Sequence, residues 1–158
     1  MTDIPLAKRL TRCPRARAPE DVSAELDRFD ADLRPLLAGA ASLAPYLATL
    51  MTKEADWLEE AVQAPEAALA GILAAPQTLE DADLNAGLRQ GKRRVALLSA
   101  LADLGGAWSL EEVTGALTRY ADAAAHAALR VSVGALIRRG KLPGLTPEDA
   151  QTGGGMTV

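Results

Sequence analysis

Hydrophobic residues recur three and four positions apart along most of the chain, which is the spacing that places them on one face of an α-helix. The longest such segment covers residues 109–139, and its apolar positions are Leu110, Val113, Leu117, Tyr120, Ala124, Ala127 and Val131. Ser109 is a favourable N-cap residue, and Glu112 three positions later completes a capping box. Gly140 follows two arginines and is typical of a left-handed helix end. The pattern therefore predicts one long, well-capped helix.

A second long helix is expected over residues 79–104, where Thr78 and Asp81 resemble another capping box. Its apolar positions are Leu84, Leu88, Val95, Leu98, Leu101 and Ala102. Gly87 and Gly91 interrupt it, and each costs about 1 kcal/mol relative to alanine. They indicate either the close approach of a neighbouring element or a weak first half. The helices predicted over residues 79–104 and 109–139 should pack together as a long antiparallel hairpin.

The segment before this hairpin contains frequent prolines, serines and threonines, which predict short helices joined by tight turns. Pro19 and Pro65 are expected to open two such helices, and Ser42 and Thr52 are expected to cap two more. Pro35 should bend or end the first of them, and Pro76 should end the last. The predicted fold class is therefore all-α, an irregular bundle of short helices packed on the long hairpin.

The hydrophobic pattern is absent from both ends of the chain. Residues 1–18 contain prolines and four arginines, so we expect a flexible basic arm there. Residues 19–140 form the expected helical domain, and the prolines and glycines after Gly140 predict a linker over residues 141–158. Three consecutive glycines at 153–155 predict a flexible joint. The final Met156-Thr157-Val158 resembles the start of a strand, which needs a partner; the tail is frayed unless the natural protein continues.

Composition supports the all-α interpretation. Of the 158 residues, 49% are hydrophobic but only 3% are aromatic, and the apolar residues are mostly alanine and leucine, which favour helices. The net charge of −4 argues against nucleic acid or an anionic membrane as a partner. Apolar stretches are far shorter than the roughly 20 residues of a membrane span, and the N-terminus lacks a secretory signal. We therefore expect a soluble, cytoplasmic protein.

Few residues suggest chemistry. His126 is the single histidine and Cys13 the single cysteine, which excludes a catalytic triad, a multi-histidine metal site and an internal disulfide. We therefore predict no catalytic and no metal-binding residue. The one candidate site is a basic cluster on the helix predicted over 79–104, formed by Arg89, Lys92, Arg93 and Arg94. It could bind a phosphate group or carboxylates of a neighbouring domain; the alternative is a solvated helix face.

Several short motifs nevertheless have a familiar order. The motifs are Ala44-Pro45-Tyr46-Leu47, Trp57-Leu58, Leu88-Arg89-Gln90-Gly91-Lys92-Arg93-Arg94, Ala102-Asp103-Leu104, Leu110-Glu111-Glu112-Val113-Thr114 and the ending Gly154-Gly155-Met156-Thr157-Val158. Together, over roughly residues 23–158, they resemble the N-terminal helical region of the bifunctional glutamine synthetase adenylyltransferase/adenylyl-removing enzymes. The chain departs from the family pattern at Ser109, where an acid is common, and at Gly87 and Gly91.

The resemblance implies a large bacterial enzyme with two nucleotidyltransferase domains that hold Mg²⁺. One domain attaches AMP from ATP to a tyrosine of glutamine synthetase, and the other, N-terminal domain removes it by phosphorolysis and gives ADP. The PII signal protein and glutamine control the balance. The catalytic residues of the family follow the first strand of the nucleotidyltransferase domain, and Val158 precedes them. No catalytic or metal-binding residue is therefore transferred to this sequence.

The leading hypothesis is a non-catalytic helical scaffold from the adenylyl-removing half, inactive alone and requiring no cofactor itself. Its first partner would be the downstream nucleotidyltransferase domain, and the family adds glutamine synthetase and PII. The alternative is a stand-alone helical module that binds another protein through its alanine-rich face or through the basic cluster.

Overall fold

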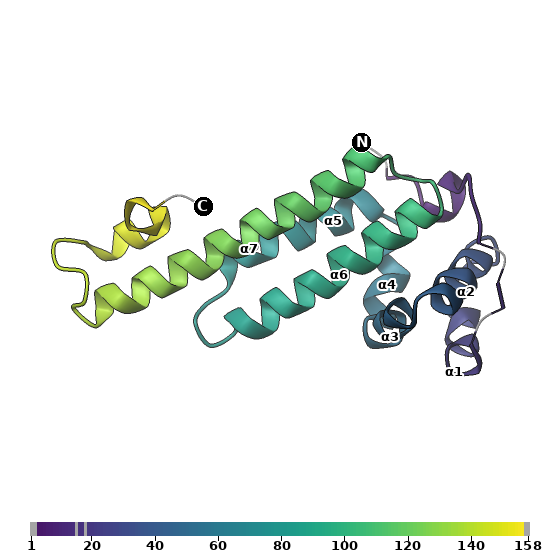
Figure 1. Cartoon of the computed structure of the whole chain (residues 1–158), viewed down its shortest axis with the longest axis horizontal. Coiled ribbons are helices and arrows are strands. Elements are labelled where there is room, and N and C mark those ends of the chain that lie inside the picture. Colours follow the sequence, from purple (N-terminus) through teal and green to yellow (C-terminus); the bar gives the residue numbers. More distant parts are fainter. Residues whose placement is uncertain (1–2, 15, 18, 157–158) are drawn as a thin grey trace.

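Two long helices form the axis of the molecule and confirm the predicted hairpin. The computed structural model describes residues 3–14, 16–17 and 19–156. Helix α6 (Leu84–Leu104) and helix α7 (Leu110–Arg138) pack against each other in antiparallel directions (Figure 1). Shorter helices cover one end of this hairpin, and the described residues contain no strand. The fold class is all-α, as the sequence predicts.

The remaining elements are short helices, several of them 3₁₀-helices. In chain order they are η1 (Leu6–Arg9), α1 (Glu20–Ser23), η2 (Glu25–Arg28), α2 (Arg34–Leu43), α3 (Pro45–Lys53), α4 (Ala55–Ala61), α5 (Pro65–Ala74), η3 (Ala75–Thr78) and η4 (Pro147–Gly155). Helices α2 and α3 pack against α6, while α5 contacts both long helices. None of the helices described is long and apolar enough to span a bilayer.

The ends of α7 have the caps that the sequence predicts. The Ser109 hydroxyl accepts a hydrogen bond from the Glu112 backbone N–H (3.2 Å), and the Glu112 carboxylate accepts one from the Ser109 N–H (2.7 Å). At the other end Gly140 has a φ of +66°. The N–H of Lys141 donates to the carbonyl of Leu136 (3.0 Å), which completes a Schellman motif. Local chemistry alone therefore fixes both limits of α7.

The glycines of α6 mark the close approach of neighbouring side chains. A Cβ atom at Gly87 would lie 2.5 Å from the Leu79 side chain, and one at Gly91 would lie 2.5 Å from the Tyr120 hydroxyl. The Tyr120 hydroxyl in turn donates a hydrogen bond to the carbonyl of Leu88 (2.5 Å). Of the two explanations offered by the sequence, close packing is the one observed.

The expected start of the first long helix is wrong. Helix α6 begins at Leu84 instead of residue 79, and the Thr78 hydroxyl donates to the carbonyl of Ala75 (3.0 Å) instead of capping a helix. Leu79 has an extended backbone, with φ −72° and ψ 132°. This conformation lets its side chain pack on Gly87, so a tertiary contact overrides the local capping signal.

The short helices also differ from prediction in their limits. The single helix expected from Pro19 is divided into α1 and η2, and Pro35 lies in the first turn of α2 instead of ending a helix. Ser42 lies inside α2, and the Thr52 hydroxyl bonds back to Ala48 (3.3 Å), so neither residue caps a helix. The predicted start at Pro65 is confirmed.

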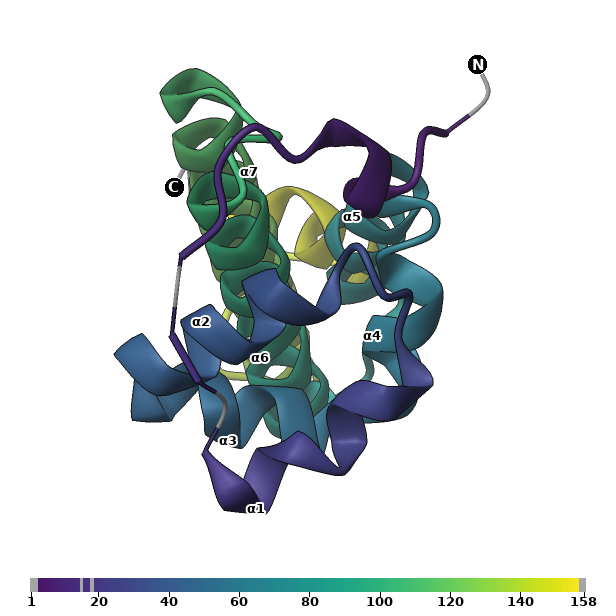
Figure 2. The same ribbon diagram turned by 90° about the vertical axis from the view of Figure 1, so that its right-hand side faces the viewer.

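The described part of residues 1–18 is packed, in contrast to the flexible arm expected from the sequence. Leu6 is fully buried, and its N–H donates to the carbonyl of Val62 (2.7 Å). The N–H groups of Thr11 and Arg12 both donate to the carbonyl of Gly105, at 2.8 and 3.0 Å. Figure 2 shows this segment crossing the end of the molecule. The prolines and arginines of this segment favour an unattached arm in the sequence. The single buried leucine that docks it is too weak a hydrophobic pattern to predict the packing.

The C-terminal segment folds back along α7 (Figure 1). Thr146 and Asp149 form a capping box at the start of η4. Gly153 and Gly154 have φ values of +63° and +65° and lie against Leu129 and Val133, respectively. Packed turns therefore occupy the place of the expected flexible joint. The strand-like residues 157 and 158 lie outside the described residues, and the division into three domains stays a prediction.

Candidate functional site

A buried carboxylate at the junction of α3 and α4 organises the predicted basic cluster. Glu54 is only 5% exposed. Its N–H donates to the carbonyl of Leu50 (2.9 Å), and its carbonyl accepts from the N–H of Leu58 (2.8 Å). The backbone of this one residue thus continues the hydrogen bonding of both helices. Its side chain points toward α6.

Two neighbouring arginines of α6 bind this carboxylate. Arg93 Nε donates to Oε1 of Glu54 (2.7 Å), and Arg94 Nε donates to Oε2 (2.9 Å). The Arg94 guanidinium also lies 5.0 Å from the ring centre of Trp57, within the range of a cation–π interaction. These contacts fasten α6 to the connection between the short helices.

Two guanidinium groups share one direct carboxylate partner in this arrangement. The Glu54 side chain is 3% exposed, and the side chains of Arg93 and Arg94 are 33% and 29% exposed. Glu25 and Asp56 line the same polar hollow as these side chains and pair with Arg28. Each arginine uses Nε toward Glu54 and has further N–H donors. Guanidinium groups bind carboxylates and phosphates through paired hydrogen bonds. The site can therefore accept one more anionic group.

The other two cations of the cluster point elsewhere. Arg89 and Lys92 are exposed, and neither forms an ion pair or side-chain hydrogen bond with the described residues. Of the four cations in the predicted cluster, the structure joins Arg93 and Arg94 at Glu54. A role for the cluster in binding a phosphate or a second domain stays a prediction.

Sequence reasoning missed Glu54. It precedes Arg93 by 39 residues, and no spacing rule links positions so far apart. One feature of the sequence hints at its burial: Glu54 stands between two apolar helical segments, where a buried charge needs a partner. The sequence does not show which residue that partner is.

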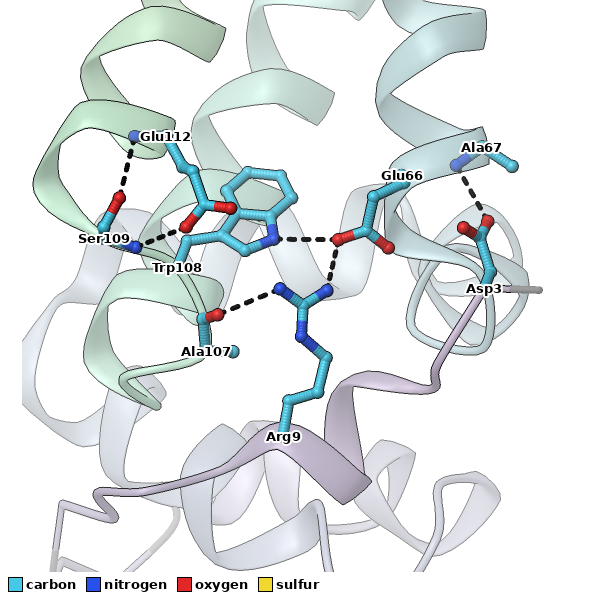
Figure 3. A network of polar contacts seen from close by, with 8 residues as sticks. All are labelled: Asp3, Arg9, Glu66, Ala67, Ala107, Trp108, Ser109 and Glu112. Carbon is cyan, nitrogen blue, oxygen red and sulfur yellow. Dashed lines mark hydrogen bonds and ion pairs between the residues drawn. The ribbon is translucent and has the colours of Figure 1, made fainter. Parts of the chain in front are cut away.

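A second polar network joins the N-terminal segment to the turn between α6 and α7 (Figure 3). The Arg9 guanidinium pairs with Glu66 at the start of α5 and donates to the carbonyl of Ala107 (3.0 Å). Trp108 Nε1 donates to the same Glu66 carboxylate (3.3 Å). Trp108 is buried at this corner, with 6% of its surface exposed.

The network changes the acidity of Glu66. Burial raises the pKa of this carboxyl, but hydrogen bonds from Arg9, from its own backbone N–H and from Trp108 together outweigh burial, so the pKa lies below its ordinary value of 4.5. The carboxylate is therefore ionised at neutral pH and contributes to the docking of residues 3–12.

Arg94 also lines an apolar cavity of about 370 Å³ between α5, α6 and α7. Its walls include Trp57, Ile72, Leu79 and the ring of Tyr120, with Arg94 at the edge. Small residues on two of the helices leave this space open. It adjoins a polar hollow formed around Glu54 and Arg93, so apolar and cationic surfaces meet at Arg94.

His126 lies in a different, more polar hollow of about 660 Å³ beside α7. Asp122 and Arg130 lie one turn before and after it on the same helix, and Arg130 donates to the carbonyl of Leu79 (2.6 Å). His126 is exposed. Cys13 is also exposed, as a free thiol.

The described residues form no group of three histidine, cysteine, aspartate or glutamate side chains suited to a metal ion.

Comparison with known proteins decides the family. The family model described as glutamate-ammonia ligase adenylyltransferase matches residues 24–158. The chain belongs to this family. Within the match lie Glu54, the arginine pair and both helices of the hairpin, so the site described above is part of the family region.

Curated relatives agree with the family assignment. All three compared here are named bifunctional glutamine synthetase adenylyltransferase/adenylyl-removing enzyme. The relative from Bradyrhizobium sp. (strain BTAi1) is 32% identical over 97% of this chain and 18% of its own length. The Caulobacter vibrioides relative is 37% identical over 80% of this chain and 13% of its own length. The Rhodopseudomonas palustris (strain TIE-1) relative is 34% identical over 89% of this chain and 15% of its own length.

The chain thus spans less than a fifth of the length of these relatives. No solved structure matches it.

Proposed function

We propose that this chain is a non-catalytic helical support in the adenylyl-removing half of an enzyme that adenylylates and deadenylylates glutamine synthetase. The observation that carries the proposal is the family match over residues 24–158, together with relatives that bear this name and are more than five times longer. In this proposal the nucleotidyltransferase domain that follows the support holds Mg²⁺ and removes AMP by phosphorolysis, whereas the second nucleotidyltransferase domain of the enzyme uses ATP to attach AMP. Glutamine synthetase and the PII signal protein are the partners of the whole enzyme.

The packing of the chain supports a mechanical role. Leu97, Leu98 and Leu101 of α6 are fully buried against the short helices, and α7 is capped at both ends. Such a hairpin is a rigid base that can hold a neighbouring domain in one orientation. The most strongly charged cluster of this base is tied to Glu54, which favours a structural use of these arginines.

The proposal is tested by comparing this chain with the longer natural protein that contains it. Phosphate-dependent release of AMP from adenylylated glutamine synthetase is the activity to measure. We expect none from residues 1–158 alone and activity from the longer protein. Replacing the buried Leu98 by alanine in the longer protein should lower activity, whereas the same change at the exposed Leu110 serves as the control.

Two results would contradict the proposal. One is AMP release by residues 1–158 alone. The other is a natural reading frame that lacks a Gly-Ser and Asp-x-Asp segment after codon 158. The latter result would favour the alternative, an independent helical module that binds another protein. The exposure of Leu110 (71%) and Leu117 (42%), two turns apart on α7, is the observation that keeps this alternative open.

A further inference from the structure

The cavity beside Arg94 has the architecture of a small-ligand site. Its volume of about 370 Å³ lies at the lower end of the range for ligand pockets, which are mostly apolar with a few polar groups at defined places. Ile72, Leu79 and the ring of Tyr120 provide apolar walls. The polar groups are Arg94 and Gln90 of α6, which lie one turn apart.

Glycines keep this space open. Gly71 of α5 and Gly91 of α6 both line the cavity. A Cβ atom at Gly91 would collide with Tyr120, so the missing side chain lets the tyrosine ring form a wall directly against the α6 backbone. At Gly71 a Cβ atom would meet no atom within 4 Å. The opening can therefore be narrowed by substitution at Gly71 without a clash.

Two guanidinium groups lie beside the cavity and share one direct carboxylate partner. Among the described residues, Glu54 is the carboxylate within ion-pair distance of Arg93 and Arg94, whereas Glu25 and Asp56 of the adjoining hollow pair with Arg28. The Arg94 side chain bonds to the described residues through its Nε alone. Its two Nη groups therefore remain as hydrogen-bond donors. Trp57 fixes the plane of this guanidinium from one side. A guanidinium group held in this orientation can donate two hydrogen bonds to the two oxygens of a carboxylate.

We infer that this cavity binds a small organic carboxylate, with the apolar body of the ligand between α5, α6 and α7 and its carboxylate on Arg94. The carboxylate of the ligand complements the guanidinium of Arg94, and its apolar part replaces water on the surfaces of Ile72 and Tyr120. This site is independent of the proposed support role, because neither requires the other.

The test uses 4-phenylbutyrate and its neutral isostere 4-phenylbutanamide as probes, titrated into the 158-residue chain by calorimetry. A ligand of about twelve non-hydrogen atoms should bind in the millimolar range or tighter. We expect one saturable site that prefers the carboxylate over the amide by about tenfold or more, because a charge-assisted pair replaces a neutral one.

Two substitutions locate the binding. Arg94→Gln should abolish the preference for the carboxylate, while Arg89→Gln, on the same helix but exposed, should leave it intact. Gly71→Leu should weaken both probes by narrowing the opening of the cavity. Gly115→Leu on α7, where a Cβ atom also meets no neighbour, is its matched control. Circular dichroism verifies that each variant is folded.

The inference is overturned if neither probe binds, if carboxylate and amide bind equally, or if Gly71→Leu and Gly115→Leu have the same affinity. If Arg94→Gln does not fold, the Gly71 and Gly115 pair still decides the question. None of these results depends on AMP release, so failure here leaves the proposed function unaffected.

Discussion

At Glu54 a single carboxylate is surrounded by two guanidinium groups, an aromatic ring and the ends of two helices. Its burial is stabilising only while the arginines remain, because a charge without a partner in such a place is strongly unfavourable. The same logic applies to the arginines, although they are less buried. The residue therefore links electrostatics to the relative positions of α3, α4 and α6.

Replacing Glu54 by glutamine should lower the free energy of unfolding by about 3 kcal/mol, since it leaves two cations facing each other without a carboxylate. Denaturant unfolding measures this value. Glu60→Gln is the matched control, because Glu60 is exposed and has no ion-pair partner among the described residues; its effect should stay within about 0.5 kcal/mol. Equal effects of the two substitutions would show that the Glu54 contacts contribute little.

At the scale of single elements, α7 is specified mainly by its own sequence. Its capping box and its glycine end involve residues no more than five positions apart, so each helix limit is encoded locally. Ser109→Ala should lower the free energy of unfolding by about 1 kcal/mol, because one N–H of the first turn loses its partner.

The control for this cap is Ser132→Ala, the same chemical change at an exposed position within α7. It should be neutral or slightly stabilising because alanine favours helix interiors. Ser109→Asp should retain most of the stability, since aspartate also caps helices. If Ser132→Ala lowered the free energy of unfolding as much as Ser109→Ala does, the capping interpretation would be contradicted.

The other elements were predictable from the sequence where nearby residues set their limits, and not where distant contacts did. The starts of α5 and α7 were predictable because proline and the capping box act within one turn. The start of α6 was not, because Leu79 leaves the helix to pack on Gly87. At the site, the arginines were visible as a cluster in the sequence, whereas Glu54 and Glu66 acquire their partners only through folding.

At the scale of the whole molecule, the Arg9–Glu66–Trp108 network connects three distant parts of the chain. The pKa of Glu66 is lower in the folded protein than its ordinary value. Its contribution to stability is therefore fully present above pH 4.5, the unfolded value, and is lost as pH falls through the lower folded pKa.

We therefore expect wild-type protein to melt at a higher temperature than Glu66→Gln near neutral pH, with the difference shrinking below pH 4.5. Thermal unfolding over a series of pH values measures the difference. Glu60→Gln, compared with wild type in the same way, controls for the removal of one negative charge. A wild-type advantage over Glu66→Gln that is constant down to strongly acidic pH would exclude the network as its cause.

The docking of residues 3–12 also has a consequence for the order in which the chain folds. The N–H of Leu6 donates to the carbonyl of Val62, and the N–H of Thr11 donates to the carbonyl of Gly105, so residues 3–12 complete their contacts only after about a hundred later residues have been synthesised. Closing loops of this length is slow relative to forming local helices. Residues 3–12 are therefore among the last parts of this region to dock, and they can do so only once the turn after α6 has formed.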